Sequence, residues 1–172
     1  MKRNLLIILT MISFLSCRTT QDLPTVESVE LSRYQGLWYE IARLPNSFEK
    51  GLECVTATYT LKSNGKIEVL NRGYSEEKGS YRSARGTARV PDPDEPGKLK
   101  VSFFWPFSGD YYILLLDEQY QYALVGAPSR KYLWVLSRTK VLDAALYVRL
   151  MDHAEQHGFD TDQVRETSQE CE

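Results

Sequence analysis

Two histidines are the residues of this 172-residue chain whose spacing comes nearest to a metal site. His153 and His157 stand four apart in the segment HAEQH, so a helix would place both imidazoles on one face, where they could share a zinc ion. The zinc-protease pattern requires a glutamate directly after the first histidine, and alanine occupies that position. The G-x-S-x-G turn of serine hydrolases is also absent from the sequence. We therefore interpret the histidines as exposed helix residues, and we predict no enzyme activity, no bound metal and no cofactor.

The first of three cysteines is placed for lipid attachment. Cys17 follows two basic residues, the apolar run LLIILTMISFL and Ser16, an arrangement typical of a secretion signal and too short to span a bilayer as a helix. A cysteine at this point resembles the bacterial motif in which the thiol receives a diacylglycerol. Cys17 would then anchor the mature chain to a membrane. Ordinary signal cleavage near this position is the alternative.

The other two cysteines, Cys54 and Cys171, would lie in an oxidising compartment, where disulfides persist. A bridge between them would close a loop of about 117 residues, and the chain-entropy model assigns such a loop roughly 4 to 5 kcal/mol of stabilisation. Two unpaired thiols are the alternative.

These features divide the chain into three predicted parts. Residues 1–16 form a signal peptide of the lipoprotein type, residues 17–31 form the lipidated N-terminus with a polar tether, and residues 32–172 form one domain. Loss of the signal removes Lys2 and Arg3, so 21 − 2 = 19 basic side chains face 23 acidic ones, a net charge of −4. A nucleic-acid surface needs clustered Lys and Arg, so we predict no nucleic-acid partner.

The elements that must position these residues are predicted to be short β-strands followed by one helix. Apolar and polar residues alternate in runs separated by turn formers, among them Asn64-Gly65. The predicted strands cover residues 36–43, 54–61, 67–73, 83–90, 98–104, 111–116, 120–126 and 133–138, and the predicted helix covers 142–157. Since an open sheet would expose its edges, we predict an all-β fold, an eight-stranded up-and-down antiparallel barrel with a C-terminal α-helix packed outside. Such a barrel is wide enough to hold one small ligand.

Three segments resemble the conserved regions of the lipocalin family. GLWYEIAR at 36–43 resembles the first region, DEQYQYALV at 117–125 the second, and YLWVLSR at 132–138 the third. The resemblance covers residues 32–171 and is nearest to the lipoprotein lipocalins of bacterial outer membranes. It implies that Gly36, Trp38 and Arg138 form the closed end of the barrel, with the guanidinium over the indole. It also implies a Cys54–Cys171 disulfide, because related lipocalins join the second strand to the C-terminal tail at matching positions.

The resemblance further implies an apolar cavity lined by inward-facing side chains. The hydroxyls of Tyr59 and Tyr111 are expected to meet a polar head group near the mouth, with Arg43 or Arg72 contributing charge. Trp105, in the segment FFWPF, is expected to narrow or reshape the pocket. For each lining residue, ordinary core packing is the alternative. The expected ligand-binding residues are Ala57, Tyr59, Val69, Val101, Phe103, Tyr111, Ala123, Val125, Trp134 and Leu136.

Bacterial members of the family bind fatty acids and lysophospholipids. The resemblance therefore implies a protein that stores or transports such lipids for envelope maintenance. It would be lipid-anchored on the outer membrane, since Arg18 rather than aspartate follows Cys17, and it would face the periplasm. Alternatives are a structural or stress-protective envelope lipoprotein, or a carrier of a pigment or another hydrophobic small molecule. Some family members dimerise, so both a monomer and a homodimer are compatible with the sequence.

Overall fold

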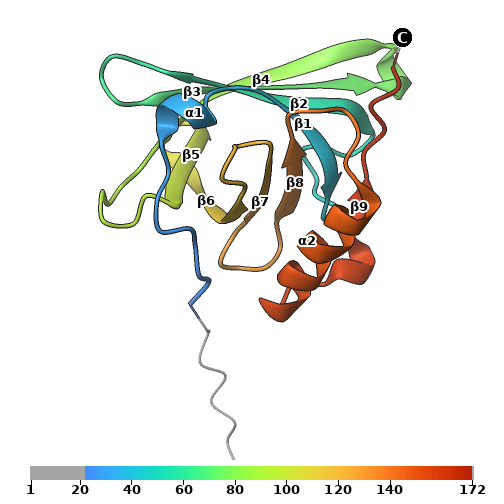
Figure 1. Ribbon diagram of the computed structural model, residues 1–172. Helices are drawn as coiled ribbons and strands as arrows, with labels where there is room; N and C mark the ends of the chain where they lie inside the picture. The colour runs from blue at the N-terminus through green and yellow to red at the C-terminus, as the bar shows by residue number, and fades with distance from the viewer. Residues whose placement is uncertain (1–21, 172) are drawn as a thin grey trace, which may run out of the picture.

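A computed structural model describes residues 22–171, which form one β-barrel with a helix against its outer surface (Figure 1). Cys17, the predicted signal peptide and the rest of residues 1–21 lie outside the described residues. The remainder of the predicted tether is described: Leu23 is completely buried, and the Val26 N–H donates to the Ile113 carbonyl at 3.0 Å. The barrel strands are β1 (Gly36–Arg43), β2 (Leu52–Leu61), β3 (Ile67–Ser75), β4 (Ser80–Arg89), β5 (Lys98–Phe104), β6 (Phe107–Leu116), β7 (Tyr122–Gly126) and β8 (Leu133–Ser137). The other elements are α1 (Leu31–Tyr34), η1 (Glu76–Lys78), α2 (Ala144–Gln156), η2 (Thr161–Gln163) and β9 (Arg165–Glu166).

Strand β1 closes the barrel because it pairs with two neighbours. Its first half is antiparallel to β2, with Gly36 opposite Tyr59, and its second half is antiparallel to β8, with Arg43 opposite Trp134. All other barrel strands pair with their sequence neighbours, so the order is that of an up-and-down barrel. The short β9 adds to the outer edge of β1. The predicted fold class is therefore confirmed.

The predicted strand boundaries are correct to within a few residues, with one informative error. The predicted seventh strand includes Tyr120, which lies in the turn before β7 with a positive φ of 58°. The Asp117 carboxylate holds this turn by accepting hydrogen bonds from the backbone N–H groups of Gln119 and Gln121. An aspartate side chain that accepts a hydrogen bond from the backbone N–H two residues later stabilises a turn, and this turn competes with strand pairing.

Two apolar clusters fill the molecule, one inside the barrel and one between the barrel and α2. The helix begins at Ala144, because the Asp143 side chain accepts a hydrogen bond from the Leu146 N–H at 2.9 Å. Its apolar stripe is completed by Leu150 and Ala154, which are fully buried in the outer cluster. The predicted packing of the helix outside the barrel is therefore confirmed.

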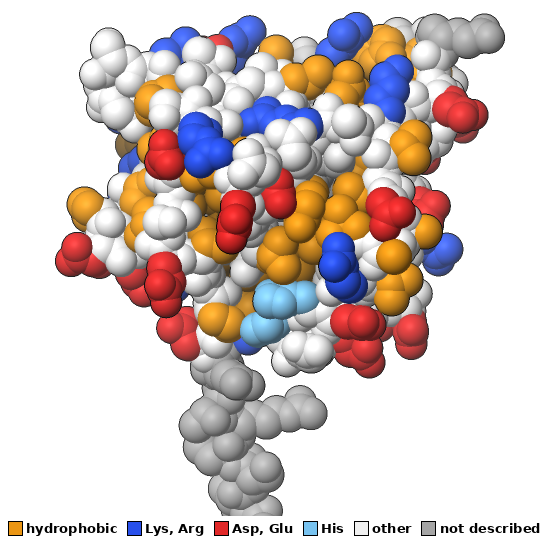
Figure 2. All heavy atoms as spheres, in the orientation of Figure 1, with side chains coloured by type: hydrophobic (Ala, Val, Ile, Leu, Met, Phe, Trp, Pro, Cys, Tyr) orange, Lys and Arg blue, Asp and Glu red, His pale blue; other side chains and the backbone are white. Residues whose placement is uncertain are grey.

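His153 lies on the last turn of α2 and His157 is the residue that caps its C-terminus, both at the surface shown in Figure 2. They are half-buried rather than exposed, and their ring centroids are 4.4 Å apart. Burial and the neighbouring His157 lower the pKa of His153. Within residues 22–171, no group of three or more His, Cys, Asp or Glu side chains is placed to hold a metal ion. The same residues contain no helix that is both long and apolar enough to cross a membrane.

A tryptophan and an arginine close one end of the barrel. Trp38 is completely buried, and the Arg138 guanidinium lies 3.8 Å from its ring centroid. Arg138 also donates hydrogen bonds to backbone carbonyls of α1 and β1, including those of Tyr34 and Leu37. Gly36 has a φ of 95°, and a Cβ there would lie 3.4 Å from the Arg138 Nη1. Glycine thus permits both the bend into β1 and the close approach of the guanidinium.

A disulfide joins Cys54 to Cys171, with Cα atoms 6.1 Å apart. This pairing decides between the two alternatives left by the sequence. It attaches the C-terminal segment to the start of β2, where the Cys54 N–H also donates to the Ser168 carbonyl.

Candidate ligand-binding cavity

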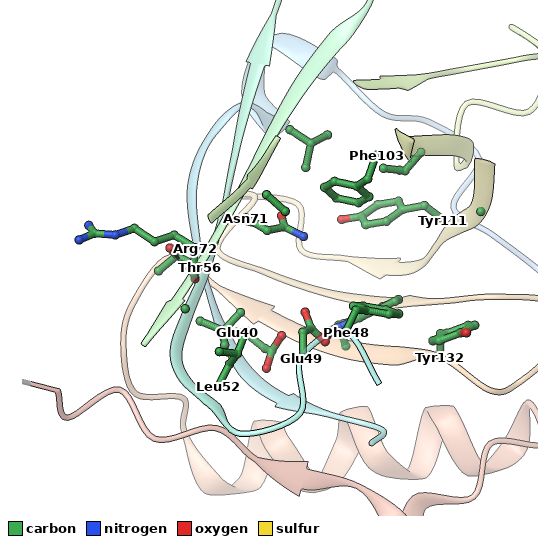
Figure 3. Close-up of a pocket in the computed structure, with 18 of the residues that line it drawn as sticks. Glu40, Phe48, Glu49, Leu52, Thr56, Asn71, Arg72, Phe103, Tyr111 and Tyr132 are labelled. Atoms are coloured by element: carbon green, nitrogen blue, oxygen red, sulfur yellow. Dashed lines mark hydrogen bonds between the residues drawn. The ribbon is translucent and has the colours of Figure 1, made fainter. Parts of the chain in front are cut away.

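The barrel encloses a cavity of about 580 Å³, a volume typical of small-molecule pockets. Strands β1 to β6 and β8 supply its lining, together with the loops β1–β2 and β7–β8 (Figure 3). Eight of the expected residues line it: Ala57, Tyr59, Val69, Val101, Phe103, Tyr111, Trp134 and Leu136.

The other two expected residues, Ala123 and Val125, do not line the cavity. Both are completely buried in the inner apolar cluster. Their inward direction was predicted correctly, because alternation along β7 determines it. Packed side chains occupy that part of the interior, and alternation carries no information on where a barrel is filled and where it is hollow.

Phe103 lies in the cavity because β4 lacks a side chain at the adjacent position. An ideal Cβ on Gly86 would lie 2.8 Å from the Phe103 ring and 2.8 Å from the Ser102 carbonyl oxygen. Such distances are too short for real contacts, so a larger residue would displace the ring. Glycine at 86 therefore helps to shape the lining.

Two phenols of the lining, Tyr59 and Tyr111, meet a third, Tyr34, at the inner end of the cavity. The Tyr111 hydroxyl is hydrogen-bonded to those of Tyr34 and Tyr59, at 2.7 and 2.8 Å. The Tyr34 ring is 5.0 Å from that of Trp38, so the phenols rest on the residue that closes the barrel. Burial raises the pKa of all three phenols, which therefore stay neutral. The expectation that Tyr59 and Tyr111 lie near the mouth is wrong, because their hydroxyls bond to each other at the closed end.

A buried polar cluster borders the cavity at β1. Arg43 Nη1 donates to the Glu40 carboxylate and to the Thr167 hydroxyl, at 2.5 and 2.7 Å. Its Nη2 donates to the carbonyls of Glu49 and Leu52, and its Nε lies 3.9 Å from Glu49 Oε2. These internal partners occupy the guanidinium. Arg43 is therefore not available to a ligand head group, contrary to expectation.

Glu40 is the chemically unusual member of this cluster. Its exposed fraction is 2%, and burial together with the negative charge of Glu49 raises its pKa from 4.5 to about 7. The charge of Arg43 and the hydrogen bonds from Arg43 and Thr167 act in the opposite direction. Two carboxylates thus share one guanidinium at the wall of an apolar cavity, and one of them gains or loses its proton near neutral pH.

Glu49 links this cluster to the aromatic part of the lining. Its Oε2 accepts hydrogen bonds from Asn46 Nδ2 at 2.5 Å and from Trp134 Nε1 at 3.1 Å. The Trp134 ring stacks on Tyr132 with centroids 5.9 Å apart, and Tyr132 in turn contacts Phe48. Trp134 is therefore held in one orientation at the cavity wall.

Two polar residues of β3, Asn71 and Arg72, also belong to the lining. Asn71 Oδ1 is buried and has no hydrogen-bond partner among the described residues, so it can accept a bond from a bound molecule. Arg72 points away from the cavity (Figure 3), and its guanidinium lies 3.8 Å from the Tyr81 ring centroid. It does not provide the expected charge inside the cavity. The cation that borders the lining instead is Arg82 of β4, which is exposed.

Sequence reasoning missed Glu40, Glu49, Asn71 and Tyr34. The signal for Glu40 was present, because alternation from Trp38 places residue 40 inward, and an acidic residue at an inward position is unusual. Asn71 carries the same signal, two residues after the inward Val69. Tyr34 and Glu49 lie outside the strands, where no period indicates direction.

Comparison of the sequence with models of known protein families shows which family has this barrel. The model described as a lipocalin-like domain matches residues 29–169. The chain belongs to the lipocalin family. This lipocalin is 46% identical over 145 residues to the outer membrane lipoprotein Blc of Vibrio cholerae, which covers 84% of this chain and 85% of the relative. It is 43% identical over 135 residues to Blc of Escherichia coli, with 78% and 76% covered. Apolipoprotein D of Mus musculus is 34% identical over 153 residues, with 85% and 80% covered.

Solved structures of similar fold include insecticyanin from the tobacco hornworm Manduca sexta. Its TM-score to this lipocalin is 0.70 at 24% identity, covering 86% of this chain and 84% of that one. The cockroach allergen Per a 4 has a TM-score of 0.69 at 23% identity, with 87% and 94% covered. These likenesses show the fold alone.

Proposed function

We propose that this lipocalin binds a single-chain acyl lipid, a fatty acid or a lysophospholipid, with its tail inside the barrel and its head group at the mouth. The observation that carries the proposal is the cavity of about 580 Å³ inside the barrel, with its apolar, aromatic lining. Burial of apolar surface is the main source of affinity in such a site, because transfer of each CH₂ from water contributes about 0.8 kcal/mol. The membership of the chain in a family of proteins that bind hydrophobic molecules supports the same conclusion.

The charges around the cavity favour a head group at the mouth. Glu40 and Glu49 lie at the cavity wall and share one guanidinium, so an anionic head placed beside them would meet net negative charge. Arg82 borders the lining from the exposed part of β4, where it can pair with a carboxylate or a phosphate. Asn71 can accept a hydrogen bond from a ligand hydroxyl, which the glycerol of a lysophospholipid supplies and a fatty acid anion does not.

The proposal includes an envelope role and a membrane anchor. We place the protein at the outer membrane, facing the periplasm, with acyl chains on Cys17, where it would store or transport lipids for envelope maintenance. Support comes from the names of the Vibrio cholerae and Escherichia coli relatives, both outer membrane lipoproteins. Several acyl chains on one residue would hold the protein stably on a bilayer. Lipocalins are typically binding or carrier proteins, and we propose no catalytic step for this one.

Calorimetric titration tests the binding function. The Cys17→Ala chain, which cannot be acylated, is titrated with palmitic acid and with a lysophosphatidylcholine below their micelle concentrations. We expect saturable binding with one molecule per barrel. The Val69→Trp variant fills the cavity at a 2% exposed lining position and should lose this binding while its far-ultraviolet spectrum is unchanged. Val148→Trp, on the 56% exposed surface of α2, is the matched control. Absence of saturable binding of either lipid to the parent chain would overturn the proposal.

A further inference from the structure

The β5–β6 hairpin ends in four consecutive apolar residues that are all exposed. Phe104 is 79% exposed, Trp105 91% and Phe107 76%, and Pro106 between them is exposed as well. Contiguous apolar surface of this kind marks an interaction site in soluble domains. The sequence predicts that Trp105 narrows or reshapes the cavity. This expectation is wrong, because its ring lies in solvent and forms no part of the lining.

The strands beneath hold this tip, residues 104–107, in place. Phe104 pairs with Phe107 across the hairpin, and the Ser102 hydroxyl donates to the Phe107 carbonyl at 2.6 Å. Lower down, Lys100 and Asp110 form an ion pair between the two strands. Within the described part of the chain, no aromatic ring or cation contacts the rings of the tip. The three rings are thus presented together and lack a partner.

The tip adjoins the mouth of the cavity. Phe104 is itself part of the lining, and the hairpin also supplies Phe103 and Tyr111, which lie next to each other inside the cavity (Figure 3). The loops β1–β2 and β7–β8 contribute two more partly exposed aromatic residues to the lining, Phe48 at 57% and Tyr132 at 37%. Aromatic side chains are therefore present both in the cavity lining and on the outer surface of the tip.

We propose that the tip inserts into the interface of a lipid bilayer and holds the mouth of the cavity against that bilayer. The tip carries no charge, and tryptophan combines a large apolar body with one N–H, the chemistry favoured at the boundary between head groups and acyl chains. Its three rings expose on the order of 500 Å², less than the ~800 Å² that each partner contributes to a stable protein interface. A small projecting wedge of this size suits a bilayer better than a second copy of the chain. Docking does not depend on which ligand the cavity holds.

Quenching of tryptophan fluorescence by brominated lipid tests the insertion. The chain has three tryptophans, Trp38, Trp105 and Trp134, and none lies in the N-terminal segment that carries the predicted anchor. The full-length protein is reconstituted in phosphatidylcholine vesicles in which half of the lipid is brominated near the carbonyl end of one acyl chain. The difference in quenching between the parent protein and Trp105→Phe isolates the contribution of Trp105. We expect most of the emission assigned to Trp105 to be quenched.

Flotation of full-length Cys17→Ala variants with the same vesicles gives a second readout. Trp105→Asp should reduce the bound fraction about tenfold, because the bilayer interior excludes a charged side chain. Val141→Asp, at an apolar position that is 80% exposed in the segment before α2, should leave it unchanged.

Equal quenching in the parent protein and in Trp105→Phe would overturn the proposal. So would dimers that disappear in Trp105→Asp when the proteins are sedimented without vesicles, because the occupant would then be a second copy of the chain. The calorimetric titration in solution does not involve the bilayer. Loss of docking with retained lipid binding therefore separates the failure of this inference from failure of the proposed function.

Discussion

The buried Glu40 should make the stability of the protein depend on pH in a direction opposite to that of most carboxylates. Its pKa is about 7 in the folded protein, against an ordinary value of 4.5. Below about pH 4.5 the carboxyl is protonated in both the folded and the unfolded chain. Between pH 4.5 and 7 the unfolded chain has lost this proton and the folded chain retains it. The free energy of unfolding therefore falls as pH rises through this window and levels off above pH 7.

The size of this effect follows from the two pKa values. The difference between 4.5 and about 7 is worth about 3 kcal/mol, at roughly 1.4 kcal/mol for each pH unit. Glu40→Gln resembles the protonated carboxyl and retains an oxygen that accepts from Arg43 and Thr167. We expect the variant to match the parent protein near pH 4, where the carboxyl is protonated in both states, and to exceed it by up to about 3 kcal/mol at pH 8.

Urea unfolding followed by tryptophan fluorescence between about pH 4 and pH 8 measures this difference. His153, whose pKa is lowered by burial, makes stability rise with pH, but its contribution is common to both proteins and cancels in the comparison. Glu68→Gln is the matched control. Its carboxyl is on the barrel surface, and ion pairs with Lys62 and Arg85 lower its pKa, so its titration falls below the window. Parallel profiles for Glu40→Gln and the parent protein would refute the reasoning.

Three further predictions concern the cavity wall, the closed end and the disulfide. Trp134→Ala should weaken acyl-lipid affinity about tenfold, which corresponds to a loss of about 1.4 kcal/mol of binding free energy, while thermal unfolding still shows one transition. Unchanged affinity by calorimetry would show that Trp134 is not part of the site. Trp38→Ala should lower the free energy of unfolding by about 3 to 5 kcal/mol, because it leaves a cavity at a fully buried position. At a temperature where the variant is folded, its loss of lipid-binding free energy should be smaller than this loss of stability. The reverse ranking would contradict the structural role of Trp38. Cys54→Ala combined with Cys171→Ala should lower that free energy by roughly 4 kcal/mol, since the bridge spans 117 residues, and urea midpoints equal to those of the parent would contradict this.

Local patterns in the sequence were sufficient for most of the fold. Alternation marked every barrel strand, because the side-chain period of a strand is two whatever the strand packs against. The C-terminal helix was visible for a similar reason, in the spacing of Leu142, Leu146 and Leu150. Patterns did not reveal α1 or β9, which have four and two residues. Elements this short have no period of their own and form only because the barrel provides their partners.

The candidate site was predictable in composition but not in arrangement. Eight of ten expected side chains line the cavity, yet the polar groups that we expected to serve a ligand, Tyr59, Tyr111, Arg43 and Arg72, serve the protein instead. Each of them is engaged by residues distant in the sequence or by a neighbouring ring, as in the 52-residue separation between Tyr59 and Tyr111. Sequence identifies a donor or an acceptor. It does not say which hydrogen-bonding partner lies beside that group in the folded protein.

The sequence by itself determined the strand order, the inward and outward faces, the family and the residues that close the barrel, because these depend on local periods and on motifs. Only the tertiary structure decided which part of the barrel interior is hollow and which part is filled by side chains. It also placed Glu40 and Glu49 on one guanidinium and turned Trp105 outward. The physical reason is the same in each case. Burial, and the pKa values and free surfaces that follow from it, depend on segments that meet only after the barrel has closed.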